Sequence, residues 1–237
     1  ELEGPIPILK ISNTEIEGYA IMAPTIRRPK TVTVFFVAQF DKPFKSLKTW
    51  QLGKLLGERD LIEGEKIGGY VDFSATSGEI RKMKVAISYV SEAQARLNME
   101  NELNHWDFDK VVAESRTDWN NWLSRITIEG GNETEQRRFY TDLWHALQGR
   151  RIISDVNGKY SDMTGPVRII RQIPLDANGK PTYNHHNSDS FWGAQWTLNT
   201  LWHLVYPEVT ESFVNSMIKM YEDGGLIPRG PAGGNYT

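Results

Sequence analysis

The sequence predicts an α+β protein, in which a β-rich N-terminal segment precedes a helical C-terminal half. Up to about residue 90, runs of β-branched and aromatic residues are separated by turn residues. After Ser91 the hydrophobic period lengthens to three and four residues, and no β-α-β alternation is present. We therefore expect an antiparallel β-sandwich at residues 1–90, linker helices at 91–130 and a helical domain at 131–237.

The clearest strand in the first segment is residues 31–40 (TVTVFFVAQF), which ends at the turn residues Asp-Lys-Pro. Residues 67–74 and 83–89 also suit strands, and in the second of these apolar and polar or small residues alternate. Turn residues recur about every ten positions, which is typical of an antiparallel sandwich. We interpret the aromatic residues here as sheet core.

Capping residues mark the helices that follow. Ser91 begins a helix through about residue 104, and Asp107 begins another through about residue 125. A short β-like stretch at 125–128 ends at two glycines. A further helix is expected at 133–148, with Asn132 or Thr134 as its cap.

The C-terminal stretch predicts two aromatic helices and a loop. Ser188 and Asp189 offer an N-cap for a helix that runs to Pro207, whose ring cannot continue a hydrogen-bonded helix. A second helix is expected at 208–222, before two glycines. The remainder, LIPRGPAGGNYT, has the composition of a loop, and loops that follow helix ends commonly hold binding groups.

Composition excludes several classes of function. With 27 basic and 30 acidic side chains the net charge is −3, so nothing indicates a nucleic-acid or anionic-membrane partner. The absence of cysteine excludes disulfides and thiolate metal sites. No segment approaches the roughly 20 apolar residues of a membrane span. Because the chain opens in what we interpret as the middle of a β domain and closes at Thr237, immediately after a loop, we interpret it as a fragment.

Two polar stretches are candidate sites. Residues 155–162 (DVNGKYSD) carry oxygen ligands suited to a hard cation, but they lack EF-hand spacing, and Asn-Gly is a strong turn signal. In residues 183–190 (YNHHNSDS), His185 and His186 are adjacent and lack the i, i+4 spacing of a helical zinc site. Asp189 either binds sugar hydroxyls or only caps the next helix.

Three further side chains suit a sugar site. Trp192 lies one turn into the expected helix and can present its ring to the apolar face of a sugar. Arg229 and Asn235 stand in the final loop, where they hold vicinal hydroxyls or, for Arg229, pair with a surface carboxylate. We interpret Trp196 and Trp202 as core residues.

Several spaced motifs resemble glycoside hydrolase family 92, the calcium-dependent exo-acting α-mannosidases. In chain order they are FVAQFDKPF at 36–44, WDF at 106–108, RFYTDLWHAL at 138–147, SDVNGKY at 154–160, SFWG at 190–193, TLNTL at 197–201, GGLIPR at 224–229 and GGNYT at 233–237. The resemblance implies an N-terminal β-sandwich and the first helices of a C-terminal (α/α)6 barrel, with the site at their interface.

The resemblance also implies an activity. We expect Ca²⁺-dependent, inverting release of terminal α-linked mannose, of the α-1,2 type, from glycans or glycoproteins, by a bacterial protein that is periplasmic, cell-surface or secreted. The residues expected to bind substrate are Trp192, Asp189, His186, Arg229 and Asn235. Both catalytic carboxyls and most residues linked to calcium are expected beyond Thr237, so no catalytic residue or calcium ligand is assigned.

The sequence departs from the family at three positions. Many relatives carry an aspartate where Gly193 stands, an arginine where Trp196 stands and a glutamate where Tyr236 stands. Losing two acids and a guanidinium alters which hydroxyls a site can bind. A non-catalytic carbohydrate-binding protein on the same scaffold and a simple interaction module therefore remain alternatives.

Overall fold

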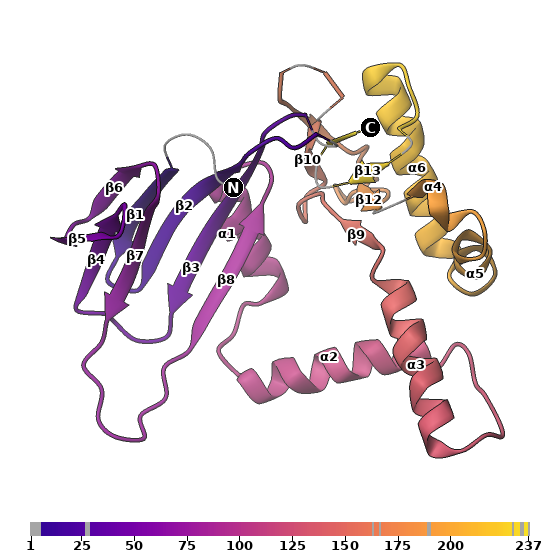
Figure 1. The fold of residues 1–237 in the computed structure, drawn as a ribbon, viewed down its shortest axis with the longest axis horizontal. Coiled ribbons are helices and arrows are strands. Elements are labelled where there is room, and N and C mark those ends of the chain that lie inside the picture. Colours follow the sequence, from indigo (N-terminus) through magenta and orange to yellow (C-terminus); the bar gives the residue numbers. More distant parts are fainter. Residues whose placement is uncertain are drawn as a thin grey trace.

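The structure is a computed structural model whose two halves differ in architecture (Figure 1). The two larger β-sheets lie in the N-terminal half, while α4, α5 and α6 lie on the opposite side of the molecule. The structure describes residues 6–26, 29–162, 164–165, 167–188, 191–228, 230–232 and 235–236, of which 231, 232, 235 and 236 are described by their backbone alone.

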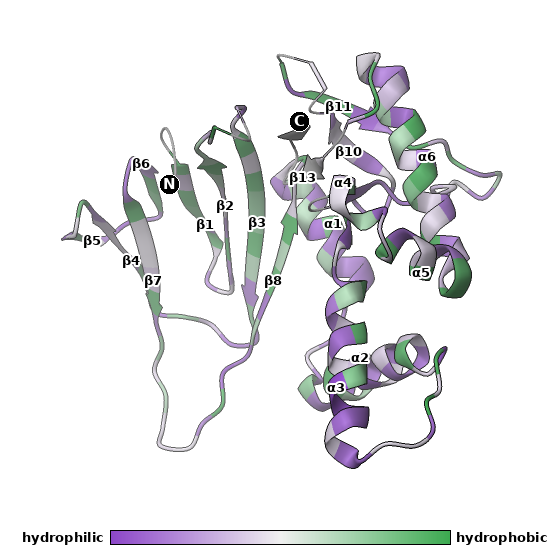
Figure 2. Ribbon diagram, turned by 45° about the vertical axis from the view of Figure 1, so that its right-hand side comes forward, coloured by the Kyte–Doolittle hydropathy of each residue, from purple (hydrophilic) through white to green (hydrophobic). Residues whose placement is uncertain are grey.

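The larger sheet has five antiparallel strands in the order β6-β1-β2-β3-β8. The strands are β1 (Ile6–Ser12), β2 (Glu15–Met22), β3 (Val32–Phe40), β6 (Leu61–Gly64) and β8 (Met83–Ser88). β3, which lies between β2 and β8, is the strand expected at 31–40, and this prediction is confirmed. Hydrophobic positions run along β1, β2 and β3 (Figure 2), as expected for strands that each bury one face.

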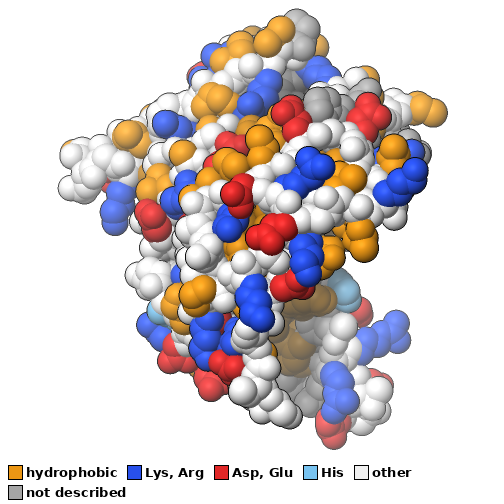
Figure 3. Space-filling view, turned by 90° about the vertical axis from the view of Figure 1, so that its left-hand side faces the viewer, with side chains coloured by type: hydrophobic (Ala, Val, Ile, Leu, Met, Phe, Trp, Pro, Cys, Tyr) orange, Lys and Arg blue, Asp and Glu red, His pale blue; other side chains and the backbone are white. Residues whose placement is uncertain are grey.

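A second antiparallel sheet has the order β5-β4-β7, formed by β4 (Ser46–Gln51), β5 (Lys54–Glu58) and β7 (Ile67–Asp72). Phe40, Phe44 and Leu47 form a buried cluster against which Ile8 and Val71 pack, so residues of both sheets share one core. This arrangement confirms the expected antiparallel N-terminal domain. Over the face seen in Figure 3, Lys and Arg side chains lie among Asp and Glu side chains.

Three capped helices follow the sheets. They are α1 (Glu92–Glu102), α2 (Phe108–Leu123) and α3 (Glu133–Leu147). The side chains of Ser91 and Asp107 accept the expected backbone hydrogen bonds at the first two. Asn132 forms a capping box with Glu135, which decides between the two caps proposed for α3. Residues 125–128 form no strand, so that expectation was wrong; no neighbouring strand pairs with them.

Short β-ladders that the sequence did not predict lie between the helices. β9 (Arg150–Ile152) pairs with β12 (His186–Ser188), and β10 (Lys159–Asp162) pairs with β11 (Ile169–Gln172). A small hairpin of β13 (Pro231–Ala232) and β14 (Asn235–Tyr236) occupies the expected final loop, and β13 lies against β12.

The aromatic stretch forms three helices rather than two: α4 (Phe191–Ala194), α5 (Leu198–Val205) and α6 (Pro207–Gly224). The single helix expected before Pro207 is interrupted because Thr197 adopts a non-helical backbone, with φ −148° and ψ −42°. Ser188 is the last residue of β12 and not a helix cap, which corrects its expected role. Gly225 ends α6 at φ 79°, as the paired glycines predicted.

The two halves meet through polar contacts. Asp155 accepts hydrogen bonds from the Ser88 hydroxyl at 2.9 Å and from the Asn98 amide at 2.8 Å. Arg168 donates to the carbonyls of Tyr89 and Val90, at 2.7 and 2.6 Å. These bonds tie β8 and α1 to the segments around β10. No helix within the described residues is long and apolar enough to cross a membrane.

Candidate functional site

The adjacent histidines occupy separate environments. His186 is 4% exposed, its Nε2 lies 2.9 Å from the Ser212 Oγ of α6, and its backbone N–H donates to the Ser216 hydroxyl. His185 is fully buried and stacks on Tyr160, with ring centroids 4.1 Å apart. The two imidazole rings therefore contact different groups and do not form one binding site. Within the described part of the chain no group of three His, Cys, Asp or Glu side chains could hold a metal ion.

Both histidines are neutral near pH 7. Burial lowers the pKa of His185 and of His186 to about 4. Neither ring nitrogen of His185 has a hydrogen-bond partner among the described residues. His186, one of the residues expected to bind substrate, can thus act as a neutral hydrogen-bonding group and not as a cation.

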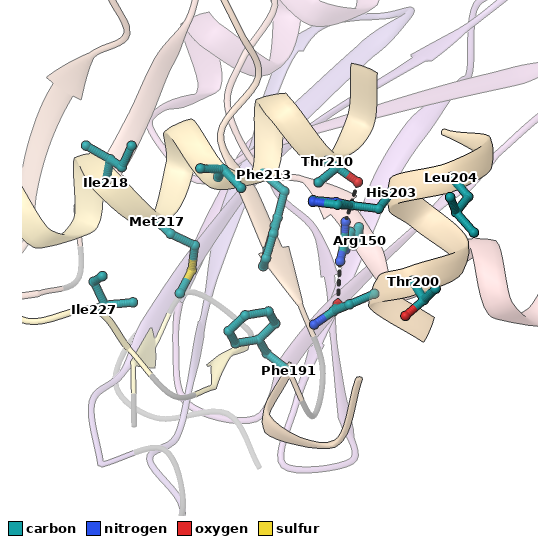
Figure 4. A pocket seen from close by; sticks show the side chains of 12 residues that line it. Arg150, Phe191, Thr200, His203, Leu204, Thr210, Phe213, Met217, Ile218 and Ile227 are labelled. Atoms are coloured by element: carbon teal, nitrogen blue, oxygen red, sulfur yellow. Dashed lines mark hydrogen bonds between the residues drawn. The ribbon is translucent and has the colours of Figure 1, made fainter. Parts of the chain in front are cut away.

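Arg150 is a partly buried cation that the sequence analysis missed. Its guanidinium lies 5.0 Å from the ring centre of Trp202 and 4.5 Å from that of Phe213. It donates to Asn199 at 2.6 Å and to Thr210 at 3.3 Å (Figure 4). Burial lowers the pKa of Arg150 to about 10, and no carboxylate in the described ranges lies within 4.0 Å of it. Arg150 therefore joins β9, α5 and α6 through neutral partners.

Arg150 borders two cavities. One, of about 610 Å³, opens between α5 and α6 and is mainly apolar; in Figure 4, Phe191, Met217 and Ile227 lie along it. The other, of about 230 Å³, lies between α2, β9 and α5 and includes His186 and Trp202 in its wall. A third cavity, of about 360 Å³, lies between the segment after β11 and α6.

Trp192 is available for ligand stacking. It is 63% exposed on α4, while the neighbouring Phe191 packs against Phe213 with ring centroids 5.1 Å apart. Trp202, expected in the core, is 3% exposed and confirms that expectation. Trp196 is 77% exposed, so its expected core position was wrong. The break before α5 explains the error, because Trp196 and Trp202 do not belong to one continuous helical stripe.

The remaining expected site residues are placed only in part. Asp189 and Arg229 lie outside the described residues, so their expected roles stay predictions. Asn235 is in β14, where its backbone pairs with Ala232. Because β13 lies against β12, the hairpin that carries Asn235 is next to the strand that begins with His186. Trp192 lines none of the three cavities described above.

A buried ionic cluster at the end of α6 was also missed. Asp223 accepts from the Tyr160 hydroxyl and lies 2.9 Å from Lys219 Nζ and 3.4 Å from Arg171 Nε. Arg171 also contacts Asp162, at 2.7 Å. Burial and the bond to Asp223 raise the pKa of Tyr160. A sequence signal existed, because Lys219 and Asp223 have the i, i+4 spacing of a helical ion pair.

The segment from residue 155 to 158 is a turn. Gly158 N–H donates to the Asp155 carbonyl at 2.8 Å, and Gly158 has φ 81°. Both carboxylate oxygens of Asp155 accept bonds from Ser88 and Asn98, and burial raises the pKa of Asp155. Asp162 and Asp223 likewise bind protein donors. The described residues therefore do not fit the calcium ion that the family resemblance implies.

Comparison with known proteins gives consistent results along the chain. Residues 3–88 match the glycosyl hydrolase family 92 N-terminal domain, and residues 94–237 match the glycosyl hydrolase family 92 catalytic domain. An uncharacterized secreted glycosidase of Arthroderma benhamiae is 30% identical over 88 residues, which cover 35% of this chain and 11% of that protein.

Solved structures share the fold. A family GH92 α-mannosidase from Bacteroides thetaiotaomicron superposes with a TM-score of 0.85 at 24% identity, covering 98% of this chain and 31% of that one. A family GH92 inverting mannosidase from the same organism gives a TM-score of 0.82 at 22% identity, covering 98% and 30%. The α-mannosidase is also known in complex with mannoimidazole. This chain thus spans about a third of the length of these enzymes.

The two family matches follow each other in chain order, and the second alone covers more than half of the sequence. The fold of the mannosidase structures extends over both halves of this chain. The chain therefore belongs to glycoside hydrolase family 92.

Proposed function

We propose that the protein to which this chain belongs releases terminal α-linked mannose, of the α-1,2 type, from glycans or glycoproteins. The consecutive match of both family domains is the observation that carries the proposal. Support also comes from the mannosidase structures that share the fold, one of which binds mannoimidazole. We propose that this activity lies outside the cytoplasm of a bacterium; the similarity to the secreted glycosidase of Arthroderma benhamiae supports export.

The proposed chemistry is hydrolysis with inversion. It needs one carboxylic acid to protonate the leaving oxygen and one carboxylate to activate water, roughly 6.5–9.5 Å apart. Asp162 and Asp223 are unsuited to these roles because Arg171 and Lys219 hold them as buried ion pairs. Asp155 is hydrogen-bonded inside the junction between the two halves. We assign no catalytic carboxyl within residues 1–237 and propose that both lie elsewhere in the protein.

We include calcium dependence in the proposed function only because of the family resemblance. The buried carboxylates of the described residues bind protein donors, so we assign none of them to calcium.

The assignment of the catalytic carboxyls gives a direct test. The 237-residue chain, expressed alone, should show no hydrolysis of 4-nitrophenyl α-mannoside above background, whereas the full-length protein should turn it over. Circular dichroism and thermal unfolding of the chain would establish that it is folded. Appreciable turnover by the purified chain would show that its own carboxyls suffice and would overturn our assignment.

Trp192 is proposed to stack on the sugar ring, because its indole is exposed on α4 next to the partly buried Phe191, which packs on Phe213. In the full-length protein, Trp192→Ala should remove roughly 1.5–3 kcal/mol of apolar burial from the bound sugar. That loss corresponds to a decrease in kcat/KM of about ten- to hundredfold. The unfolding temperature should stay nearly unchanged since the side chain is mostly exposed. An unaltered kcat/KM would remove Trp192 from the site.

A second function should be tested because of two residues in and just after α4. Gly193 of α4 and Trp196 of the turn that follows stand where many relatives carry an aspartate and an arginine, and Trp196 is exposed. These changes favour a non-catalytic carbohydrate-binding protein on the same scaffold. Mannose binding without hydrolysis by the full-length protein would support this alternative; restoration of hydrolysis by Gly193→Asp together with Trp196→Arg would identify the responsible positions.

A further inference from the structure

The third cavity, of about 360 Å³, has two rigid walls. On α6, Asn215, Ile218, Lys219 and Glu222 follow each other at i, i+3, i+4 and i+7 and so share one face of the helix. The opposite wall is the segment 172–175 with Tyr183. We name this space the Tyr183–Asn215 cavity. None of the residues expected to bind substrate lines it.

Backbone hydrogen bonds hold the wall opposite α6 in place. Ile173 N–H donates to the Gly158 carbonyl at 2.9 Å, and Thr182 N–H donates to the Pro174 carbonyl at 2.9 Å. Asn184, next to Tyr183, exchanges hydrogen bonds with Ser212 of α6 at 3.1 and 3.0 Å. The cavity is therefore formed before any ligand arrives, and this lowers the entropic cost of binding.

Two polar groups that line the cavity have no hydrogen-bond or ion-pair partner among the described residues. Neither the Tyr183 hydroxyl nor the Asn215 side-chain amide has a hydrogen bond or ion pair with any described residue. Burial raises the pKa of Tyr183, so its hydroxyl remains a donor near neutral pH. Together these groups offer donors and acceptors, the combination that a hydroxyl-bearing ligand needs.

The charges in the cavity oppose an anionic ligand. Among the described residues that line the cavity, Lys219 is the only cation, and its Nζ lies 3.3 Å from Glu222 and 2.9 Å from Asp223. Its charge is thus already matched by two carboxylates. Ile218 and Leu175, each about half exposed, supply apolar surface beside these polar groups. A neutral ring with hydroxyls on its edge and C–H groups on its face fits this lining.

We propose that the Tyr183–Asn215 cavity is a second saccharide-binding site, which takes one neutral sugar unit of a glycan. Its volume lies within the range of roughly 300–1,000 Å³ typical of small-molecule sites. The Asn215 amide binds ring hydroxyls, and Tyr183 contributes its hydroxyl and its ring. None of the residues expected to bind substrate lines this cavity, and it holds a glycan without cleaving it.

Fluorine NMR of the full-length protein labelled with 3-fluorotyrosine tests this inference. The Tyr183 resonance is the one missing from Tyr183→Phe. The resonance of Tyr221, an exposed residue of α6 that does not line the cavity, is assigned in the same way. Methyl α-mannopyranoside, a probe chosen on the proposed function, should shift the Tyr183 resonance saturably and leave Tyr221 unchanged. Asn215→Ala should weaken this response about tenfold, as expected for the loss of net hydrogen bonds to one amide.

The outcomes separate this inference from the proposed function. A Tyr183 resonance that does not move with methyl α-mannopyranoside or methyl α-glucopyranoside would overturn the second site, and so would a shift with inorganic phosphate alone. An equal response in Asn215→Ala would also overturn it. If mannoside hydrolysis is absent but the Tyr183 response and its loss in Asn215→Ala are observed, the proposed function fails and the second site stands.

Discussion

Replacing Asp223 with alanine should lower the free energy of unfolding by about 3 kcal/mol, the lower part of the range for breaking a buried ion pair. The Asp223 side chain is 4% exposed. It accepts a hydrogen bond from the Tyr160 hydroxyl and forms ion pairs with Lys219 and Arg171. Its removal leaves a buried hydroxyl without an acceptor and two cations with less compensation. Urea unfolding of the wild type and the variant measures the difference.

Glu222 provides a matched control for this experiment. It also contacts Lys219, at 3.3 Å, but its side chain is 57% exposed. Glu222→Ala should therefore change the free energy of unfolding by no more than about 1 kcal/mol. Asp223→Asn keeps a hydrogen-bond acceptor for Tyr160. Its loss in the free energy of unfolding should therefore lie between those of the two alanine variants. Equal effects of Asp223→Ala and Glu222→Ala would show that the buried cluster adds no stability.

Acidification should destabilise the protein between about pH 6.5 and pH 4. Burial lowers the folded-state pKa of His185 and His186 to about 4, so in this window the unfolded chain binds more protons than the folded one. Stability is then highest above pH 6.5 and is lost as the pH falls toward 4. Each shift corresponds to roughly 3 kcal/mol over the whole window. The free energy of unfolding, measured by urea titration at several pH values, tests this expectation.

The variant His185→Phe isolates one of the two contributions. It keeps a ring beside Tyr160 and removes a group that titrates, so the slope of stability against pH should fall by about 1.4 kcal/mol per pH unit inside the window. The slope is the readout, because a larger ring also changes packing and therefore absolute stability. Exposed His203, which lines the apolar cavity, offers a control. An unchanged slope in His185→Phe would mean that His185 is not buried as a neutral group.

Local signals in the sequence predicted much of the fold. The run at 31–40 became β3, and the caps Ser91, Asp107 and Asn132 begin α1, α2 and α3, because both depend on chemistry within a few residues. The pairing of β9 with β12 could not be predicted in this way. These three-residue strands are far apart in the sequence, and polar residues such as Asn187 and Ser188 are buried only through tertiary contacts.

The candidate site shows the same limit. Spacing alone assigned Trp196 to the core, and the non-helical backbone of Thr197 removed the helical register on which that assignment depended. The sequence around Arg150 did not indicate its role, because that role depends on contacts with the rings of Trp202 and Phe213, which lie on two later helices. Family membership was nevertheless apparent from the spaced motifs, because they depend on residue identity rather than on packing.

Hydrolysis of α-linked mannose disaccharides by the full-length protein tests the central claim most directly. Proton NMR during the first minutes should show release of mannose as the β-anomer, the product of inversion, with the α-1,2 disaccharide consumed fastest. The same reaction with a calcium chelator should stop and should resume when calcium is restored. Absence of mannose release from every disaccharide, with mannose still bound, would contradict the hydrolase function and leave carbohydrate binding as the function of this scaffold.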